Sequence, residues 1–296
     1  MRARVRMIIA MLIFGSIGLF VRTINMPSGV LALVRGSIGT IFLLLAGAAM
    51  KRRISLPAIR RNLKLLIFSG AAIGVNWICL FEAYRYTTIA AATLCYYLAP
   101  VFVIVVSPFF LKEKLTVMKV GCVTVSLIGM MLVADIFGGG HENASGLKGI
   151  TFGITAALLY ASVVIMNKFL KEIEAVDMTV SQLGIASLVL LPYVLATEDG
   201  TGLSFRGGTL FLLLIVGIVN TGIAYLLYFS SLKDLSGQTA ALFSYIDPVT
   251  AILLSALLFH ENMSMEQTLG AALILGSTLV SELMGKRGNM PADTAA

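Results

Sequence analysis

Three ionisable side chains lie in or beside long apolar stretches of this 296-residue sequence. Asp247 lies about ten residues into an apolar run and directly precedes Pro248. Glu82 lies near the end of another run, three residues before Arg85, and Arg35 lies about two helical turns into a third. Ionisable side chains inside a membrane span are costly and mark ligand, ion or proton sites, so these three are candidate binding residues.

Each of these side chains also has a purely structural interpretation. Asp247 can bind an ammonium group or a proton, or it can pair with Arg35 to join two helices. Arg35 can hold a carboxylate with its planar guanidinium group, or it can extend to lipid headgroups. Glu82 can bind a cation, or it can form a local ion pair with Arg85 one helical turn away. The sequence leaves these alternatives open.

Aromatic and amide side chains extend the set of candidate binding residues. Aromatic rings can line a pocket for a cationic or amphipathic ligand, and amides can hydrogen-bond to it. Packing or helix joining is the alternative role for all of them. These candidates are Trp77, Tyr96, Tyr97, Tyr225, Tyr245 and Asn76.

Residues 97–113 and 245–261 are two copies of one motif, in which Tyr, Pro, Val, Ile, Ser and Glu recur at a spacing of 148 residues. Each copy contains a proline, Pro100 or Pro248, that we expect to kink a membrane helix. Such a kink in the second copy would free the carbonyl group of Ser244. The sequence thus predicts exposed polar backbone beside Asp247.

Each copy of the motif ends in a carboxylate, Glu113 or Glu261, for which we expect a structural or gating role. Weaker similarities between the two halves extend the duplication beyond the motif. Corresponding positions are Phe14-Gly15-Ser16 and Tyr160-Ala161-Ser162, Arg35 and Gln182, Trp77 and Tyr225, Glu82 and Ser230, Arg85 and Lys233, and Ala99 and Asp247. The chain therefore consists of two related halves.

The composition indicates a polytopic membrane protein, because 58% of residues are hydrophobic and only 12% are charged, against roughly 25% charged in soluble domains. Ten apolar runs are about long enough to cross a bilayer. Residues 1–138 and 146–286 would each hold five of them, followed by a short cytoplasmic tail at 287–296. Since five is odd, the second half would enter the membrane from the opposite side. The sequence predicts an all-α integral membrane fold of two inverted five-helix repeats.

Lysine and arginine are distributed unequally between alternate loops. With both termini in the cytoplasm, the inner side carries seventeen of them and the outer side four, as the positive-inside rule requires. This rule also accounts for the net charge of +7, so nucleic-acid binding is not expected. We expect a multi-pass protein of the cell (plasma) membrane, in bacteria the inner membrane, with the lipid bilayer as its surroundings.

The sequence lacks the residue patterns that several kinds of chemistry require. Cys79, Cys95 and Cys122 all lie in apolar runs, which favours packing over disulfides or metal ligation. The sequence contains only two histidines, His141 and His260, and no GxxxxGK[ST] loop, so neither an HExxH zinc site nor ATP-driven transport by this chain is expected. We expect no metal, no cofactor and no enzymatic activity.

Residues 81–116 and 227–264 resemble the repeated signature of the EamA-type ten-helix transporters of the drug/metabolite transporter superfamily. In that signature, a basic residue and small residues precede Tyr-x-x-Pro-Val and a closing Glu. The resemblance covers nearly the whole chain. It implies ten helices, cytoplasmic termini, a cavity between the two repeats and transport of small metabolites, often as export.

The expected function is therefore secondary transport by alternating access. The substrate would be a small polar or amphipathic metabolite, such as an amino acid, amine or carboxylate, and protons are a candidate driving ion. The alternatives are multidrug efflux of cationic amphiphiles and, from another class, a membrane-embedded lipid-modifying enzyme. The sequence leaves substrate, direction, coupling ion and oligomeric state open.

Overall fold

The computed structural model describes residues 2–21, 23–24, 26–52, 54–86, 92, 95–133, 144–198, 207–259 and 265–287. These residues form helices and contain no strand. The first half contains α1 (Arg2–Val21), α2 (Ser28–Ala49), α3 (Leu56–Arg61), α4 (Leu63–Tyr86), α6 (Ala99–Phe110) and α7 (Val117–Val133). The second half contains α8 (Ala144–Phe169), α9 (Ala175–Thr197), α10 (Gly207–Gly217), η2 (Ile218–Ile223), α11 (Ala224–Asp234), α12 (Gly237–Phe243), α13 (Ile246–Phe259) and α14 (Met265–Arg287).

Length and apolarity make several of these helices suitable for a bilayer, where every backbone polar group must be bonded within the helix. Among the described residues, five helical stretches are long and apolar enough to cross a membrane. They are Ser28–Ala49, Leu63–Tyr86, Gly146–Phe169, Ala175–Thr197 and Gly207–Asp234. Shorter apolar helices span Ala99–Phe110, Val117–Leu132 and Thr268–Ser277. The prediction of an all-helical membrane fold is confirmed.

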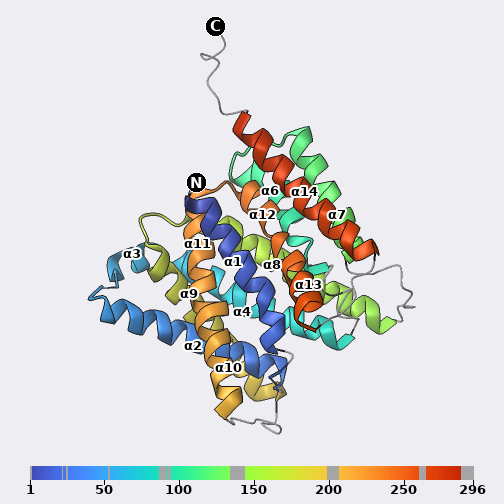
Figure 1. Cartoon of the computed structure of the whole chain (residues 1–296). Helices are drawn as coiled ribbons and strands as arrows, with labels where there is room; N and C mark the ends of the chain where they lie inside the picture. The colour runs from blue at the N-terminus through green and yellow to red at the C-terminus, as the bar shows by residue number, and fades with distance from the viewer. Residues whose placement is uncertain are drawn as a thin grey trace.

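The two halves of the chain interleave in space (Figure 1). From the first half, α4 packs along α8 and α9, α2 packs along α9, and α1 packs against α11 and α13. The helices α7 and α14, which end the two halves, lie side by side at one edge of the molecule (Figure 1). As a result, any space enclosed by α1, α4, α8 and α11 is bounded by both halves.

A glycine allows the closest of these approaches, between α1 and α13. A Cβ atom at Gly15 would lie 2.6 Å from the carbonyl oxygen of Asp247 and 2.6 Å from Cβ of Thr250. Real Cβ atoms do not approach other atoms so closely, so only glycine lets α1 contact the first turn of α13. This contact fixes the position of Asp247 relative to α1.

The helices near the two motif prolines differ from the prediction. Instead of one kinked helix, the second copy forms α12 and α13, which are separated at Ser244 and Tyr245. The carbonyl of Ser244 is not freed, because it accepts a hydrogen bond from the backbone N–H of Asp247 at 3.3 Å. Pro100 likewise lies in the first turn of α6. Proline is well tolerated in a first turn, where its missing N–H is not needed.

A π-helical turn, η2, separates α10 from α11 within one continuous helical stretch. The Thr221 hydroxyl donates to the carbonyl of Val216, five residues earlier, at 2.9 Å. The side-chain amide of Asn220 donates to the carbonyl of Ile13 in α1 at 2.6 Å. Such turns are frequent at functional sites, and this one directly precedes the aromatic side chains of α11.

Candidate functional site: a central cavity

A cavity of about 440 Å³ lies between the two halves. Its wall comes from α1, α2, α4, α6, α8, α11 and α13 and from residues next to α6 and α13. Most of the lining is apolar or aromatic, and among the described residues Arg35 and Asp247 are the charged ones that line it. The lining residues are Met11, Phe14, Gly15, Ile17, Arg35, Trp77, Leu80, Phe81, Tyr84, Tyr96, Tyr97, Ala99, Pro100, Tyr160, Tyr225, Tyr228, Ser244, Asp247 and Ala251.

Aromatic rings contact one another around this cavity. Trp77 and Tyr225, which occupy equivalent positions in the two halves, meet edge to face with ring centroids 6.1 Å apart. Tyr225 also meets Phe14 at 5.1 Å, and the hydroxyl of Tyr160 donates to that of Tyr228 at 2.5 Å. Such pairs contribute roughly 0.5–1.5 kcal/mol each beyond the burial of their area. The aromatic wall is therefore held in a defined shape.

Arg35 is stabilised in the cavity by an aromatic ring. Its guanidinium carbon lies 4.4 Å from the centroid of the Trp77 ring, a cation–π contact. Within the described part of the chain, no acidic side chain forms an ion pair with Arg35. The Trp77 contact leaves the edge of the guanidinium group able to bind a carboxylate in two hydrogen bonds.

Asp247 lies in the first turn of α13 and faces the same cavity. Its carboxylate accepts a hydrogen bond from the hydroxyl of Tyr97. A carboxylate with one phenolic partner retains further acceptor capacity. Arg35 from the first half and Asp247 from the second therefore give the cavity one charge of each sign.

Of the predicted binding residues, Arg35, Trp77, Tyr96, Tyr97, Tyr225 and Asp247 line the cavity, whereas three others do not. The carboxylate of Glu82 pairs with Arg85 at 3.0 Å and accepts from the Tyr193 hydroxyl at 2.6 Å. The Asn76 amide donates to the Ala156 carbonyl at 2.5 Å and joins α4 to α8.

Tyr245, the third residue that does not line the cavity, is fully buried. Its hydroxyl donates to the Tyr97 carbonyl at 3.3 Å, which joins the two copies of the motif. The contacts of these three residues are those expected of structural residues.

The residues predicted for kinking or gating have different surroundings. Pro100 lines the cavity, and Pro248 is buried next to Asp247. Glu113 accepts hydrogen bonds from the backbone N–H groups of Gly237 at 2.7 Å and Gln238 at 3.1 Å. Glu261 lies outside the described residues. The gating role of these residues stays a prediction.

The sequence interpretation missed several lining residues, among them Phe14, Tyr84, Tyr160 and Tyr228. A signal for three of them was present. Phe14 and Tyr160 correspond across the two halves, and Tyr228 follows Tyr225 by three residues, which places it one helical turn further along α11. Tyr84 carries no comparable signal in the sequence.

The described residues contain no group of three or more His, Cys, Asp or Glu side chains that could hold a metal ion. Cys79, Cys95 and Cys122 are buried and are not joined in a disulfide.

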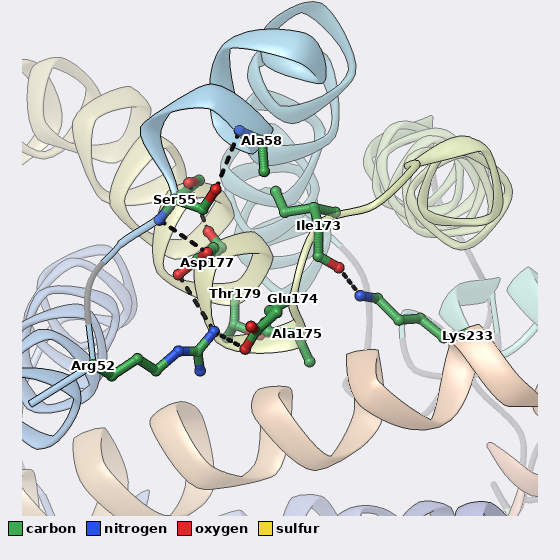
Figure 2. A network of polar contacts seen from close by, with 10 residues as sticks. Arg52, Ser55, Ala58, Ile173, Glu174, Ala175, Asp177, Thr179 and Lys233 are labelled. Carbon is green, nitrogen blue, oxygen red and sulfur yellow. Dashed lines mark hydrogen bonds and ion pairs between the residues drawn. The ribbon is translucent and has the colours of Figure 1, made fainter. Parts of the chain in front are cut away.

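Polar contacts concentrate at the end of the bundle that holds the start of α1, the α8–α9 connection and the end of α11, here called the amino-terminal face. Figure 2 shows Asp177 at the start of α9, which accepts from the backbone N–H of Ser55 at 3.3 Å and lies 3.6 Å from the Arg52 guanidinium. Arg52 also pairs with Glu174, and the Lys233 ammonium contacts the Ile173 carbonyl (Figure 2). The α8–α9 connection thus joins α2, α9 and α11 at this face.

The cavity lies away from this face of the bundle. It is lined by the second half of α1, the second half of α4 and the first turns of α13, all of which point away from the amino-terminal face. A small void lined by Ile73, Asn76, Val163 and Phe229 lies below Tyr160 and Tyr225. The aromatic layer and the polar contacts therefore separate the cavity from the amino-terminal face.

A cavity between two related halves of an apolar helical bundle is typical of membrane transporters built from repeats. The chain matches the model of the EamA-like transporter family twice, over residues 3–134 and 147–282. It therefore belongs to this family of the drug/metabolite transporter superfamily, whose members are transporters and not enzymes.

Relatives with detectable identity are also transporters by name. The chain is 31% identical over 272 residues to the uncharacterized transporter YxxF of Bacillus subtilis (strain 168), covering 92% of this chain and 86% of the relative. It is 22% identical over 230 residues to the uncharacterized inner membrane transporter YicL of Salmonella typhimurium, covering 76% and 74%. A solved crystal structure has the same fold, with a TM-score of 0.86 at 18% identity over 97% of this chain and 99% of that one.

Proposed function

We propose that this transporter carries a small amphipathic metabolite with a carboxylate and an amine, such as an amino acid, through the central cavity by alternating access. The observation that carries this proposal is the presence of Arg35 and Asp247 as the charged residues in the described lining of a cavity of about 440 Å³ whose wall is otherwise largely apolar and aromatic. A carboxylate would bind the guanidinium edge of Arg35, an ammonium would bind Asp247, and an apolar group would contact the rings.

We further propose ten membrane spans in two inverted repeats. The spans would be α1, α2, α4, α6 with the residues before it, α7, α8, α9, the α10–η2–α11 stretch, α12 with α13, and α14. The termini would be cytoplasmic, which the positive-inside distribution of lysine and arginine supports, and the membrane would be the bacterial inner membrane. We take the direction of transport to be export, the direction that similarity to the family implies.

Multidrug efflux remains a second candidate function because the aromatic wall and Asp247 suit a cationic amphiphile. Arg35 argues against it, since a fixed positive charge in the same cavity repels a cation. A ligand test can therefore separate the two functions.

The test is a thermal-shift screen of the purified protein in detergent against amino acids, amines, carboxylates, sugars and cationic dyes. A ligand at one hundred times its dissociation constant stabilises a protein by about 2.7 kcal/mol. We expect amino acids to give the largest shift, Arg35→Gln to reduce stabilisation by carboxylates, and Asp247→Asn to reduce stabilisation by amines.

Lys64→Gln, at an exposed cation that does not line the cavity, is the matched control and should behave like the parent. Stabilisation by dyes alone would favour multidrug efflux. If no compound in the panel stabilises the protein, a small-metabolite cargo is contradicted.

A further inference from the structure

The corner between α11 and α12, residues 232–238, is held by side chains from two other elements. The ammonium of Lys168, at the end of α8, contacts the backbone carbonyls of Leu232 and Leu235. The carboxylate of Glu113, which follows α6, accepts hydrogen bonds from the backbone N–H groups of Gly237 at 2.7 Å and Gln238 at 3.1 Å. A cation thus meets the carbonyls that end one helix, and an anion meets the amides that begin the next.

Lys168 and Glu113 act on this corner together. Among the described residues, Lys168 forms no ion pair with an acidic side chain, although Glu113 is close enough to interact with it electrostatically. Gln238 is fully buried, and its amide donates to the Ser107 hydroxyl at 2.7 Å. Opening the amino-terminal face between α8 and α11 would require these contacts to break.

Lys233, which follows Leu232 on α11, also contacts the backbone of another element. Its ammonium binds the carbonyl of Ile173 in the α8–α9 connection (Figure 2). The residue at the corresponding position of the first half is Arg85. Arg85 instead forms ion pairs with Glu82 at 3.0 Å and Glu198 at 3.3 Å. Glu82 corresponds to Ser230, so Lys233 has no acidic side chain one helical turn before it.

We propose that Lys168, Lys233 and Glu113 are positioning residues that hold the amino-terminal face closed, and that Arg85 is the equivalent cation of the opposite face. In the structure, the ion pairs with Glu82 and Glu198 keep Arg85 from binding backbone carbonyls. When the cavity closes on the opposite face, Arg85 leaves the two carboxylates and binds backbone carbonyls of that face, as Lys233 binds the carbonyl of Ile173. This inference rests on transport by alternating access.

The experiment measures from which side the cavity is accessible and needs no substrate. Cys79, Cys95 and Cys122 are replaced by alanine, and Ser244→Cys places a single thiol in the cavity wall. A membrane-impermeant thiol reagent is then added to right-side-out or inside-out vesicles, and the labelling rate is measured from each side. In the parent single-cysteine protein, the thiol should be labelled from the side opposite the amino-terminal face.

In this background, Lys168→Met and Glu113→Gln should each raise labelling from the amino-terminal side about tenfold, the effect of losing one charge-assisted hydrogen bond. Lys168→Arg should restore the parent pattern because it retains the cation. The matched control is Lys171→Gln, at an exposed cation of the same connection. A purely structural role would lower the melting temperature without changing the side from which the thiol is labelled.

The double variant Glu82→Gln and Glu198→Gln releases Arg85 and should lower labelling from the opposite side several-fold. Adding Arg85→Ala to this double variant should restore labelling from the opposite side to the parent rate. Unchanged sidedness in folded Lys168→Met and Glu113→Gln variants would overturn the proposed role of these residues. Equal labelling of the parent from both sides would overturn the premise that one face is closed, whereas a failed ligand screen with the expected sidedness would contradict only the proposed substrate.

Discussion

Asp247 is the single acidic side chain in the described lining of the cavity, so a transported proton would bind there. Its carboxylate already accepts a hydrogen bond from Tyr97 and lies on the first turn of α13, in contact with α1 through Gly15. A proton arriving at this carboxylate would neutralise it and leave Arg35 as the charged side chain of the described lining.

We predict that Asp247→Asn abolishes substrate transport driven by a pH gradient, whereas substrate exchange continues at saturating substrate, since the amide binds an ammonium more weakly than the carboxylate does. The amide preserves the shape of the side chain but cannot release or accept the coupling proton. Reconstituted protein with an imposed pH gradient provides the measurement, and counterflow without a gradient provides the control. If the variant transports substrate at the parent rate under a pH gradient, Asp247 is excluded as the proton site.

Trp77 is predicted to position Arg35 as well as to line the cavity. Trp77→Leu removes the ring beneath the guanidinium group, and cation–π contacts are worth roughly 0.5–2 kcal/mol, so affinity for carboxylate ligands should fall by about 2- to 30-fold. Trp77→Phe should retain much of the affinity. Binding measured by thermal shift or calorimetry tests this. An equal loss for ligands without a carboxylate would show that Trp77 contacts the ligand directly.

The candidate residues that could be predicted from sequence were those that combine an unusual chemical type with an apolar context. Asp247, Arg35 and Trp77 stand out in this way, and all three line the cavity. Glu82 satisfies the same criterion, yet its position near Arg85, Glu198 and Tyr193 depends on how α4 packs on α9. The sequence contains Glu198 and Tyr193 but does not place them beside Glu82.

At the scale of helices, close packing of α1 on α13 determines where Asp247 lies. We predict that Gly15→Ala lowers the melting temperature and impairs transport, because a Cβ would lie 2.6 Å from the Asp247 carbonyl oxygen. Gly47→Ala is the matched control, since a Cβ there meets nothing within 4 Å and alanine favours a helix by about 1 kcal/mol over glycine. A Gly15→Ala variant as stable and active as Gly47→Ala would contradict the close contact.

Asn62 joins α3 and α4 to the connection between α8 and α9. Its amide nitrogen donates to the carbonyls of Ala58 at 2.9 Å and Lys171 at 2.8 Å, and its oxygen accepts from the Lys171 N–H at 3.0 Å. We predict that Asn62→Ala destabilises the protein by about 1–3 kcal/mol, because buried backbone groups would lose their partners.

Thermal unfolding of the Asn62→Ala variant in detergent provides this measurement. Arg61→Gln is the control, as it removes a neighbouring ion pair with Glu172 whose side chains are 59% and 73% exposed, and such exposed pairs contribute little. Equal melting temperatures for the two variants would contradict the prediction.

The breaks in the helices were harder to predict than the helices themselves. The motif prolines indicated a local irregularity, but a kink and a new helix start have the same sequence signal. The outcome depends on which N–H group bonds the Ser244 carbonyl, and in the structure it is that of Asp247. The π-helical turn at Ile218–Ile223 has no signal in hydrophobic periodicity, because it shifts the register of an otherwise uniform apolar run.

For the whole molecule, an even number of membrane spans requires both termini on one side. We predict that tags fused to either end are inaccessible to protease in intact cells and become accessible in inside-out vesicles. A reporter inserted in the loop between α7 and α8 should show the opposite behaviour. Tags on opposite sides of the membrane would mean an odd number of spans.

Both charged residues of the described cavity lining lie at positions where the two related halves carry different residue types. Arg35 corresponds to Gln182, which is buried and hydrogen-bonded to Ser69 and Asn167, and Asp247 corresponds to Ala99. A cation, an anion and an aromatic wall are three unlike contact points, so a substrate with one group for each is bound in a single orientation. A chain built by duplication, which in its symmetric form would bind a substrate in two equivalent orientations, has thereby acquired a cavity that holds it in one of them.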